Sequence, residues 1–306
     1  MGNDKDNYDF LMLSDIEYRN REVREELKKW GKWYYETTHF DGIRLDALKH
    51  ITPGWPVEWL DYMRQQVNPD LVAIGEYWTA EKVDMMEKYI EATEGRIKLF
   101  DAPLHYNFCR ASNCDKDFDL RTIFDNTLVR THPTLAVTFV DNHDTQPMQA
   151  LESCVESWFK TIAYALILLR QDGYPCIFYA DFYGVKYQDK GKDGTQCKVV
   201  LPQLKEIKKL LVLRKKYAYG EQTDYFDHEN CIGWVRSGSE EGPGCIVLLT
   251  NCEKSEKRME VGARYAGKSF VDFLHPNSEE VIIDEDGTGV FQVEAKSVSV
   301  WVLKEE

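Results

Sequence analysis

The chain has 306 residues, of which 43% are hydrophobic and 13% aromatic, enough to form one large packed domain or two ordinary ones. Its formal charge is 38 − 52 = −14, which argues against nucleic-acid binding because neutralising phosphates requires clustered Lys and Arg. The longest apolar run, residues 161–169, is too short to span a bilayer, and the N-terminus lacks the pattern of a signal peptide. We therefore expect a cytoplasmic protein with no nucleic-acid or membrane partner.

The eight cysteines support the same expectation. No two of them have CxxC spacing, and several lie within apolar runs such as YPCIFYA and PGCIVLL. Such a pattern is typical of reduced, buried thiols in a cytosolic protein rather than of a disulfide framework.

Helix and strand patterns alternate over residues 1–219. Apolar residues at helical spacing predict helices at 20–38, 58–67, 81–93, near 119–129, 156–170 and 201–218. Short apolar runs predict five strands at 40–47, 71–78, 97–105, 135–144 and 174–184, the last ending in a turn. The strands are nearly continuous in apolar residues, as expected for strands buried on both faces, and the alternation predicts a parallel α/β sheet with right-handed crossovers.

From residue 220 onward the pattern changes to short strands. The runs CIGWVRS, GCIVLLTN, KRMEVG, KSFVDFL, EEVIIDEDG and GVFQVEAKSVSVWVLK are separated by Gly, Asn and Asp turn residues. They predict that residues 220–306 form a second domain, an antiparallel β-sandwich.

Polar side chains follow four of the five predicted parallel strands. They are Arg44 and Asp46, then Glu76, then Asp101 and His105, then Asp141, Asn142, His143 and Asp144. Active sites of (β/α) barrels lie at the C-terminal ends of the strands. One such acid alone would be interpreted as a solvated loop residue. Several converging carboxylates would be costly without a function, since buried charges need partners.

Two of these carboxylates suit the hydrolysis of a glycosidic bond, which needs a nucleophile and an acid/base. Because residues two apart share a strand face, Arg44 and Asp46 point the same way, either as a surface ion pair or as a carboxylate kept ionised in a polar cavity. The apolar neighbours of Glu76 would raise its pKa, as a proton donor requires. Tyr77 and Trp78 offer ring faces for sugars.

Three segments resemble signature segments of the α-amylases of glycoside hydrolase family 13, in particular the liquefying bacterial type. They are DGIRLDALKHI (41–51), GEYW (75–78) and FVDNHDTQP (139–147), and the resemblance covers essentially the whole chain. It implies a retaining hydrolase that cleaves α-1,4-glucosidic bonds in starch-like glucans. It also implies that residues 1–219 are part of a (β/α)8 TIM barrel, strands four to eight.

The resemblance assigns roles by motif position. It implies Asp46 as the nucleophile, Glu76 as the general acid/base, and Asp144 as the third carboxylate, which binds the distorted sugar. Further substrate-binding residues are Arg44, which orients Asp46, His143, which contacts the same sugar, Lys49 and His50 on the product side, and Trp78.

A calcium site is implied by YDFLMLSDIEY (8–18), which resembles the family's calcium segment. Asp9 and Asp15 match metal-ligand positions, as does the backbone carbonyl of His50, and such oxygen donors suit Ca²⁺. Simple loop or cap residues are the alternative for the two aspartates. Glu17 stands where the family carries an Asp that belongs to an adjacent second metal site.

The chain departs from the family in its strand count. The family barrel has eight strands, but five are predicted here, and the family's first signature segment and its inserted domain are absent. Because open sheet edges and exposed apolar faces associate, we expect self-association or an N-terminal half-barrel partner. We expect little or no activity without that part. The alternatives are a non-catalytic fragment that binds glucan or packs against a partner, and a transglycosylase.

Overall fold

The computed structural model describes residues 16–191 and 194–304. The chain divides into two compact units, which are described separately below. The first comprises residues 1–103 and 126–137, and the second comprises residues 104–125 and 138–306. In the described ranges, no helix is both long enough and apolar enough to cross a membrane.

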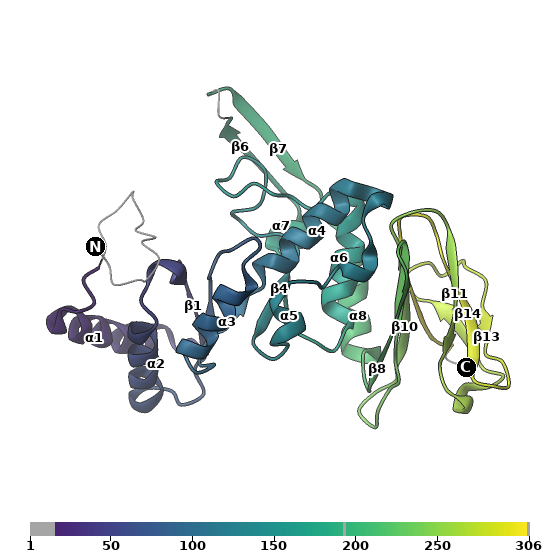
Figure 1. Ribbon diagram of the computed structural model, residues 1–306, viewed down its shortest axis with the longest axis horizontal. Helices are drawn as coiled ribbons and strands as arrows, with labels where there is room; N and C mark the ends of the chain where they lie inside the picture. Colours follow the sequence, from purple (N-terminus) through teal and green to yellow (C-terminus); the bar gives the residue numbers. More distant parts are fainter. Residues whose placement is uncertain (1–15, 192–193, 305–306) are drawn as a thin grey trace. The chain divides into compact units, whose positions relative to one another are not determined.

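Helices and strands alternate through residues 21–217, as the sequence predicts (Figure 1). The helices are α1 (Arg21–Thr38), α2 (Gly54–Gln66), α3 (Val83–Ala92), α4 (Ala102–Cys114), α5 (Leu128–Thr131), α6 (Ser157–Leu169), α7 (Tyr179–Tyr183) and α8 (Glu206–Tyr217). The sheet strands are β1 (Gly42–Leu45), β2 (Val72–Gly75), β3 (Lys98–Phe100), β4 (Ala136–Phe139) and β5 (Tyr174–Cys176). They are hydrogen-bonded in the order β1-β2-β3-β4-β5, with β1 to β4 parallel. The predicted five-stranded partial barrel sheet is confirmed.

Helix α1 forms where the helical apolar spacing predicts it. The side chain of Asn20 caps its N-terminus by accepting the Glu22 N–H at 2.9 Å. Gly31 allows α2 to approach closely, because a Cβ there would lie 2.6 Å from the Trp59 ring. The Trp59 indole N–H donates to the Leu27 carbonyl at 3.1 Å and joins the two helices.

The predicted strand at 97–105 is too long. Strand β3 ends at Phe100, and α4 begins at Ala102, so His105 lies on a helix and not at a strand end. Proline is well tolerated in the first turn of a helix, and Pro103 occupies that turn. Ala102 and Leu104, which the prediction placed in the strand, are therefore buried residues of α4.

Three further elements differ from the prediction. The helix expected near 119–129 is a 3₁₀ turn at Leu120–Thr122 followed by the short α5, and α7 replaces the turn after β5. The hairpin of β6 (Val185–Lys190) and β7 (Gln196–Leu201) was not predicted. Its first strand, VKYQDK, is rich in polar residues and has no buried position, so its apolar signal is weak.

Residues 222–303 form antiparallel sheets, within the second unit. The strands are β8 (Gln222–His228), β9 (Cys231–Arg236), β10 (Cys245–Thr250), β11 (Ser255–Glu260), β12 (Ser269–Asp272), β13 (Val281–Ile282), β14 (Thr288–Val293) and β15 (Val298–Leu303) (Figure 1). Six are ordered β13-β12-β15-β10-β9-β8, and β11 pairs with β14. Side chains from both sheets share one apolar core that includes Phe270, Phe291 and Trp301. The predicted β-sandwich is confirmed, β8 is an additional strand, and the domain boundary at residue 220 stays a prediction.

All eight cysteines carry free thiols. Cys231 and Cys245 are buried, Cys114 is exposed, and the other five are half-buried. The expectation of buried thiols is therefore correct for the two cysteines of the β-sandwich core and wrong for Cys114.

Candidate active site

The backbone of β1 and β2 places two acidic residues side by side in the first unit. Arg44 pairs with Ile74 in the parallel ladder. Beyond the strands the pairing continues, because the Glu76 N–H donates to the Leu45 carbonyl at 2.9 Å and the Leu48 N–H donates to the Glu76 carbonyl at 2.8 Å. The turn after β1 is thus held against the residue that follows β2.

One guanidinium joins the two acids. Arg44 Nη1 donates to Asp46 Oδ1 at 2.6 Å, and Arg44 Nη2 donates to Glu76 Oε2 at 2.9 Å. The prediction that Arg44 and Asp46 share one face is confirmed. The side chain of Asp46 is 72% exposed and that of Glu76 is 13% exposed, so one carboxylate is open to solvent and the other is enclosed.

The environment of Glu76 favours its protonated form. Burial raises the pKa of Glu76, and hydrogen bonding to Asp46 and the negative charge of Asp46 raise it further, whereas Arg44 and the Ala47 N–H oppose the shift. The raised pKa agrees with the sequence-based expectation. Apolar neighbours were the predicted cause, and the nearby second carboxylate adds to it. A carboxyl group that retains its proton can act as a general acid.

The turn between the two acids has an unusual backbone. Ala47 has φ 51° and ψ 39°, a left-handed conformation that non-glycine residues rarely adopt. Its N–H lies 3.4 Å from Glu76 Oε2. Gly75, the last residue of β2, leaves room for this turn, because a Cβ there would lie 2.2 Å from Leu48 Cδ1. Strained turns of this kind gather at functional sites, and the sequence carried no signal for this one.

The aromatic residues after Glu76 differ from the prediction. Tyr77 is 7% exposed and packs against Tyr89, with ring centroids 5.1 Å apart. It cannot present a face to a sugar, because alternation along the strand turns it into the core when Glu76 faces outward. Trp78 is half-buried, as are Lys49 and His50 in the 3₁₀ turn after β1.

The predicted calcium ligands Asp9 and Asp15 lie outside the described residues, and only His50 lies within them. In residues 16–191 and 194–304, no group of three or more His, Cys, Asp and Glu side chains is arranged to hold a metal ion. The Glu17 carboxylate instead binds Arg19, whose Nε donates at 2.8 Å.

In the second unit, the segment after β4 forms a tight turn that carries His143 and Asp144. The Asn142 side-chain oxygen accepts the N–H groups of Asp144 and Thr145, both at 2.9 Å, in an Asx turn. His143 Nε2 lies 3.4 Å from Asp144 Oδ2, and these side chains are 62% and 34% exposed. Both predicted site residues therefore reach the surface of their unit.

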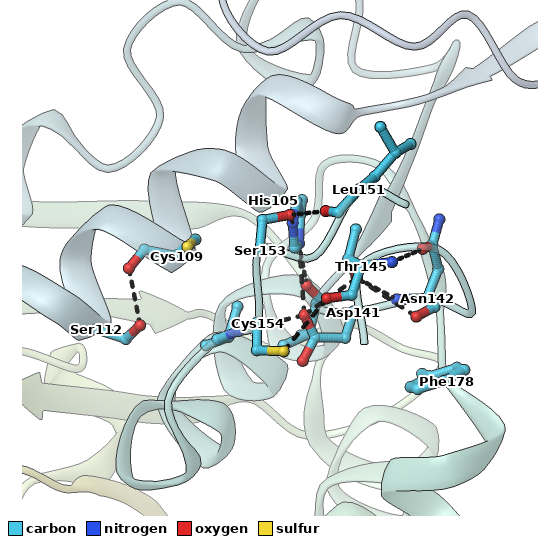
Figure 2. A network of polar contacts seen from close by, with 12 residues as sticks. His105, Cys109, Ser112, Asp141, Asn142, Thr145, Leu151, Ser153, Cys154 and Phe178 are labelled. Carbon is cyan, nitrogen blue, oxygen red and sulfur yellow. Dashed lines mark hydrogen bonds and ion pairs between the residues drawn. The ribbon is translucent and has the colours of Figure 1, made fainter. Parts of the chain in front are cut away.

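Three polar residues predicted at the strand ends are used inside the fold. The buried Asp101 carboxylate accepts the Leu128 and Val129 N–H groups at the start of α5. Buried Asp141 pairs with Lys160 at 2.8 Å. Buried His105 Nδ1 lies 3.7 Å from Asp141 Oδ1 (Figure 2). The inference that all these groups converge on one site is wrong for Asp101, Asp141 and His105. Lys160 was missed, although a single lysine in the apolar run ESWFKTIAYALILL was a readable signal.

Two family models match the chain. Residues 6–209 match the alpha-amylase catalytic domain, and residues 245–302 match the alpha-amylase C-terminal domain. The chain is 46% identical over 299 residues to the cytoplasmic alpha-amylase of Escherichia coli (strain K12), covering 98% of this chain and 60% of that protein. It is 48% identical over 299 residues to the alpha-amylase of Geobacillus stearothermophilus, covering 97% and 52%. The chain thus spans between half and three fifths of the length of these relatives.

The fold resembles solved amylase structures. An Anoxybacillus alpha-amylase superposes with a TM-score of 0.70 at 20% identity, covering 96% of this chain and 65% of that one. The alpha-amylase of Geobacillus thermoleovorans, solved in complex with acarbose, superposes with a TM-score of 0.68 at 20% identity, covering 94% and 65%. Family models and close relatives agree along nearly the whole sequence, and the chain belongs to the alpha-amylase family.

Proposed function

We propose that this chain carries the catalytic machinery of a retaining glycoside hydrolase that cleaves α-1,4-glucosidic bonds in starch-like glucans. The observation that carries the proposal is the Arg44 guanidinium, which binds Asp46 and Glu76 together. Two carboxylates that share one guanidinium lie within reach of a single sugar ring. Their different exposures suit different roles, because an exposed ionised carboxylate can attack and an enclosed one with a raised pKa can donate a proton.

The proposed reaction has two displacement steps. Asp46 attacks the anomeric carbon while Glu76 gives its proton to the glycosidic oxygen, so that the leaving glucan departs and a covalent glycosyl-enzyme forms. Glu76, now ionised, takes a proton from water, and this water releases the sugar from Asp46 with net retention. Arg44 orients Asp46 in both steps.

The remaining substrate contacts are proposals that rest on family membership. Asp144 binds the distorted sugar at the cleaved bond, and His143 contacts the same sugar. On the product side, Lys49 and His50 contact the next sugar, and Trp78 supplies an aromatic face. The exposure of His143 and Asp144 is compatible with these roles.

The test is an assay on starch and on a maltooligosaccharide, first with the purified chain alone and then with an added polypeptide equivalent to the part of the relatives' length that the match does not cover. We expect little or no hydrolysis by the chain alone. With the added polypeptide we expect new reducing ends, with the α anomer formed first, as NMR of the fresh products would detect. Initial release of the β anomer contradicts the double displacement. Transfer of glucosyl units to an added acceptor sugar would instead indicate a transglycosylase, and a cyclomaltodextrin glucanotransferase of Bacillus sp. (strain 1-1) is 23% identical to this chain.

A second candidate function is non-catalytic glucan binding. The observation that favours it is that the chain spans only 52% and 60% of the length of two close relatives. Glucan binding by calorimetry, without hydrolysis even when the polypeptide of the uncovered part is added, would support this alternative.

We also propose that the chain binds Ca²⁺ through Asp9, Asp15 and the backbone carbonyl of His50. Carboxylate and carbonyl oxygens form the donor set that Ca²⁺ prefers. A ligand that binds only the folded state raises the unfolding temperature by mass action. We expect chelation with EDTA to lower the unfolding temperature and added Ca²⁺ to restore it. The variant Asp15→Asn should lose the Ca²⁺ response, and an unchanged response in that variant would contradict the proposed ligand set.

A further proposal concerns a partner polypeptide for the first unit. Helix α1 exposes three aromatic rings, Trp30, Trp33 and Tyr34, which are 52%, 58% and 43% exposed. Tyr34 stacks on both tryptophans, with centroids 5.5 and 6.4 Å apart. The neighbouring β1 is the outer strand of its sheet in the described part of the chain. Exposed aromatic clusters beside open strands mark interfaces.

The occupant that we propose is a polypeptide equivalent to the part of the relatives' length that the match does not cover. Light scattering after size-exclusion chromatography tests this surface. We expect association of the wild-type chain, weakened in a Trp30→Ser, Trp33→Ser double variant, and dissociation when a polypeptide of the uncovered part is added. Association that survives its addition would indicate a second copy as the occupant. If the wild-type chain and the double variant are both monomers with the same unfolding temperature, the proposed interface is contradicted.

We also propose a cytoplasmic location, which the free thiols and the name of the Escherichia coli relative support.

A further inference from the structure

Lys160 is a buried cation on a mostly apolar helix. It lies on α6 and is 7% exposed. Its ammonium group pairs with Asp141 Oδ2 at 2.8 Å and with Asp181 Oδ1 at 2.6 Å, and both aspartate side chains are 2% exposed. The nucleophile and acid/base proposed above lie on other elements, so this network has no place in the two displacement steps.

One arm of the network holds the loop that carries His143 and Asp144. The Asp141 carboxylate accepts the Thr145 hydroxyl at 3.4 Å (Figure 2). It also accepts the Val155 N–H at 3.3 Å, so it joins both ends of the loop from 141 to 155. The Thr145 hydroxyl in turn accepts the Asn142 N–H at 2.9 Å. Asp141 therefore holds Thr145, and Thr145 holds Asn142, whose side chain forms the turn. The position of Asp141 thus fixes the start of the segment that presents His143 and Asp144.

The other arm reaches the segment after β5. Asp181 lies on α7 and accepts the Tyr164 hydroxyl at 2.8 Å. Tyr164 comes from α6, one turn beyond Lys160, and its oxygen accepts the Phe178 N–H at 3.3 Å. Lys160 therefore links the segments that follow two consecutive strands, β4 and β5, to the helix that connects those strands.

The outer part of the loop has a separate support. The Tyr187 hydroxyl on β6 donates to the Pro147 carbonyl at 2.5 Å, and the Gln149 amide donates to Asp189 at 3.0 Å. These contacts do not involve Lys160. Loss of Lys160 should therefore affect the inner ends of the loop, where Asp141 acts, more than its tip.

Removing the ammonium would leave Asp141 and Asp181 buried with like charges and no cation between them. A buried pair that loses one partner is strongly destabilised, and the remaining carboxylates would turn toward water or take up protons. Either response withdraws Asp141 from Thr145 and Val155. The turn that carries Asp144 would then lose its anchor while the rest of α6 stays packed.

We propose that Lys160 is a positioning residue that clamps Asp141 and Asp181 and so holds the turn presenting His143 and Asp144 in a catalytically competent arrangement. The clamp is a property of the second unit. Its effect on catalysis rests on the proposed glucan hydrolase function. Two separate readouts keep the clamp and that function distinguishable.

The experiment compares Lys160→Met with Lys160→Arg, which keeps the charge, and with Lys216→Met, which removes an exposed lysine from α8. Hydrogen exchange with mass spectrometry follows residues 141–146 and 153–156, with α8 as the internal reference. We expect exchange of the two loop segments to become about tenfold faster in Lys160→Met, with α8 unchanged. Most of the protection should return in Lys160→Arg, and Lys216→Met should match the wild type.

The kinetic readout uses a chromogenic maltooligosaccharide, with the polypeptide of the uncovered part added. A misplaced Asp144 should lower kcat by up to about 10²-fold with little change in KM, and Lys160→Arg should recover part of it. Unchanged loop exchange in Lys160→Met, or equal acceleration in the loop and in α8, would overturn the clamp. If the wild-type chain shows no hydrolysis even with the polypeptide of the uncovered part added, the proposed function fails, and the exchange data still decide the role of Lys160. If Lys160→Met does not fold, Tyr164→Phe, which removes one hydrogen bond to Asp181, should show a smaller acceleration in the same loop.

Discussion

Replacing Glu76 with glutamine is expected to lower the rate of glucan hydrolysis by about 10²- to 10⁴-fold, the usual contribution of a general acid. The amide keeps the size of the side chain and can still accept from Arg44, but it has no proton that it can transfer to the leaving oxygen. The measurement is kcat/KM on a maltooligosaccharide at several pH values, with the polypeptide of the uncovered part added. Hydrolysis that persists in Glu76→Gln would remove Glu76 from the proposed mechanism.

The same variant should be more stable than the wild type near neutral pH. Burial and Asp46 raise the pKa of Glu76 in the folded protein, so its ionised form costs folding free energy above that pKa. Glutamine removes this cost, and the gain in unfolding temperature should disappear at low pH, where Glu76 is protonated. An exposed carboxylate of the same unit, in Glu91→Gln, serves as the control for both readouts. A Glu76→Gln protein that is less stable than the wild type at pH 7 contradicts the described environment.

Replacing either Asp141 or His105 is expected to make the stability of the protein depend more strongly on pH than it does in the wild type. Burial raises the pKa of Asp141 to about 6 from 3.8 and lowers the pKa of His105 to about 4 from 6.5. His105 Nδ1 donates to the Val140 carbonyl at 2.5 Å, since a carbonyl can only accept, and the ring is neutral over most of this range. Lys160 and Asp181 also face Asp141, and Lys160 stays charged because its pKa is raised by both carboxylates.

The two shifts have opposite signs. On folding between pH 4 and 6, Asp141 takes up a proton and His105 releases one, so their contributions to the slope of stability with pH largely cancel. In Asp141→Asn only the His105 shift remains, and stability should fall relative to the wild type as the pH drops from 6.5 to 4. In His105→Gln only the Asp141 shift remains, and stability should fall as the pH rises from 4 to 6. Each change amounts to about 3 kcal/mol.

Urea unfolding of each variant over this pH range, taken as the difference from wild type, measures the two slopes. The exposed His228 provides a control in His228→Gln, for which we expect no such difference. Slopes of the same sign in Asp141→Asn and His105→Gln would contradict the opposite pKa shifts of these two groups on folding.

Much of the fold could be predicted from the sequence, because it depends on periodicity that local residues carry. The apolar spacing of α1, α6 and α8, and the five strands of the sheet, follow from which faces must be buried. The charged residues of the candidate site could be predicted as well, since Arg44, Asp46 and Glu76 occur at strand ends in segments with strong family resemblance.

Only the tertiary structure decided what the other polar residues do. A strand and a helix N-terminus both tolerate the apolar run at 97–105, and the choice depends on packing that distant residues supply. Whether a carboxylate faces substrate, a helix N-terminus or a buried lysine depends on which donors the fold brings to it, as Asp101 and Asp141 illustrate. Sequence determined which charges the strand ends carry, and packing determined which of them are satisfied inside the protein, because a buried charge persists only where the fold provides its partner.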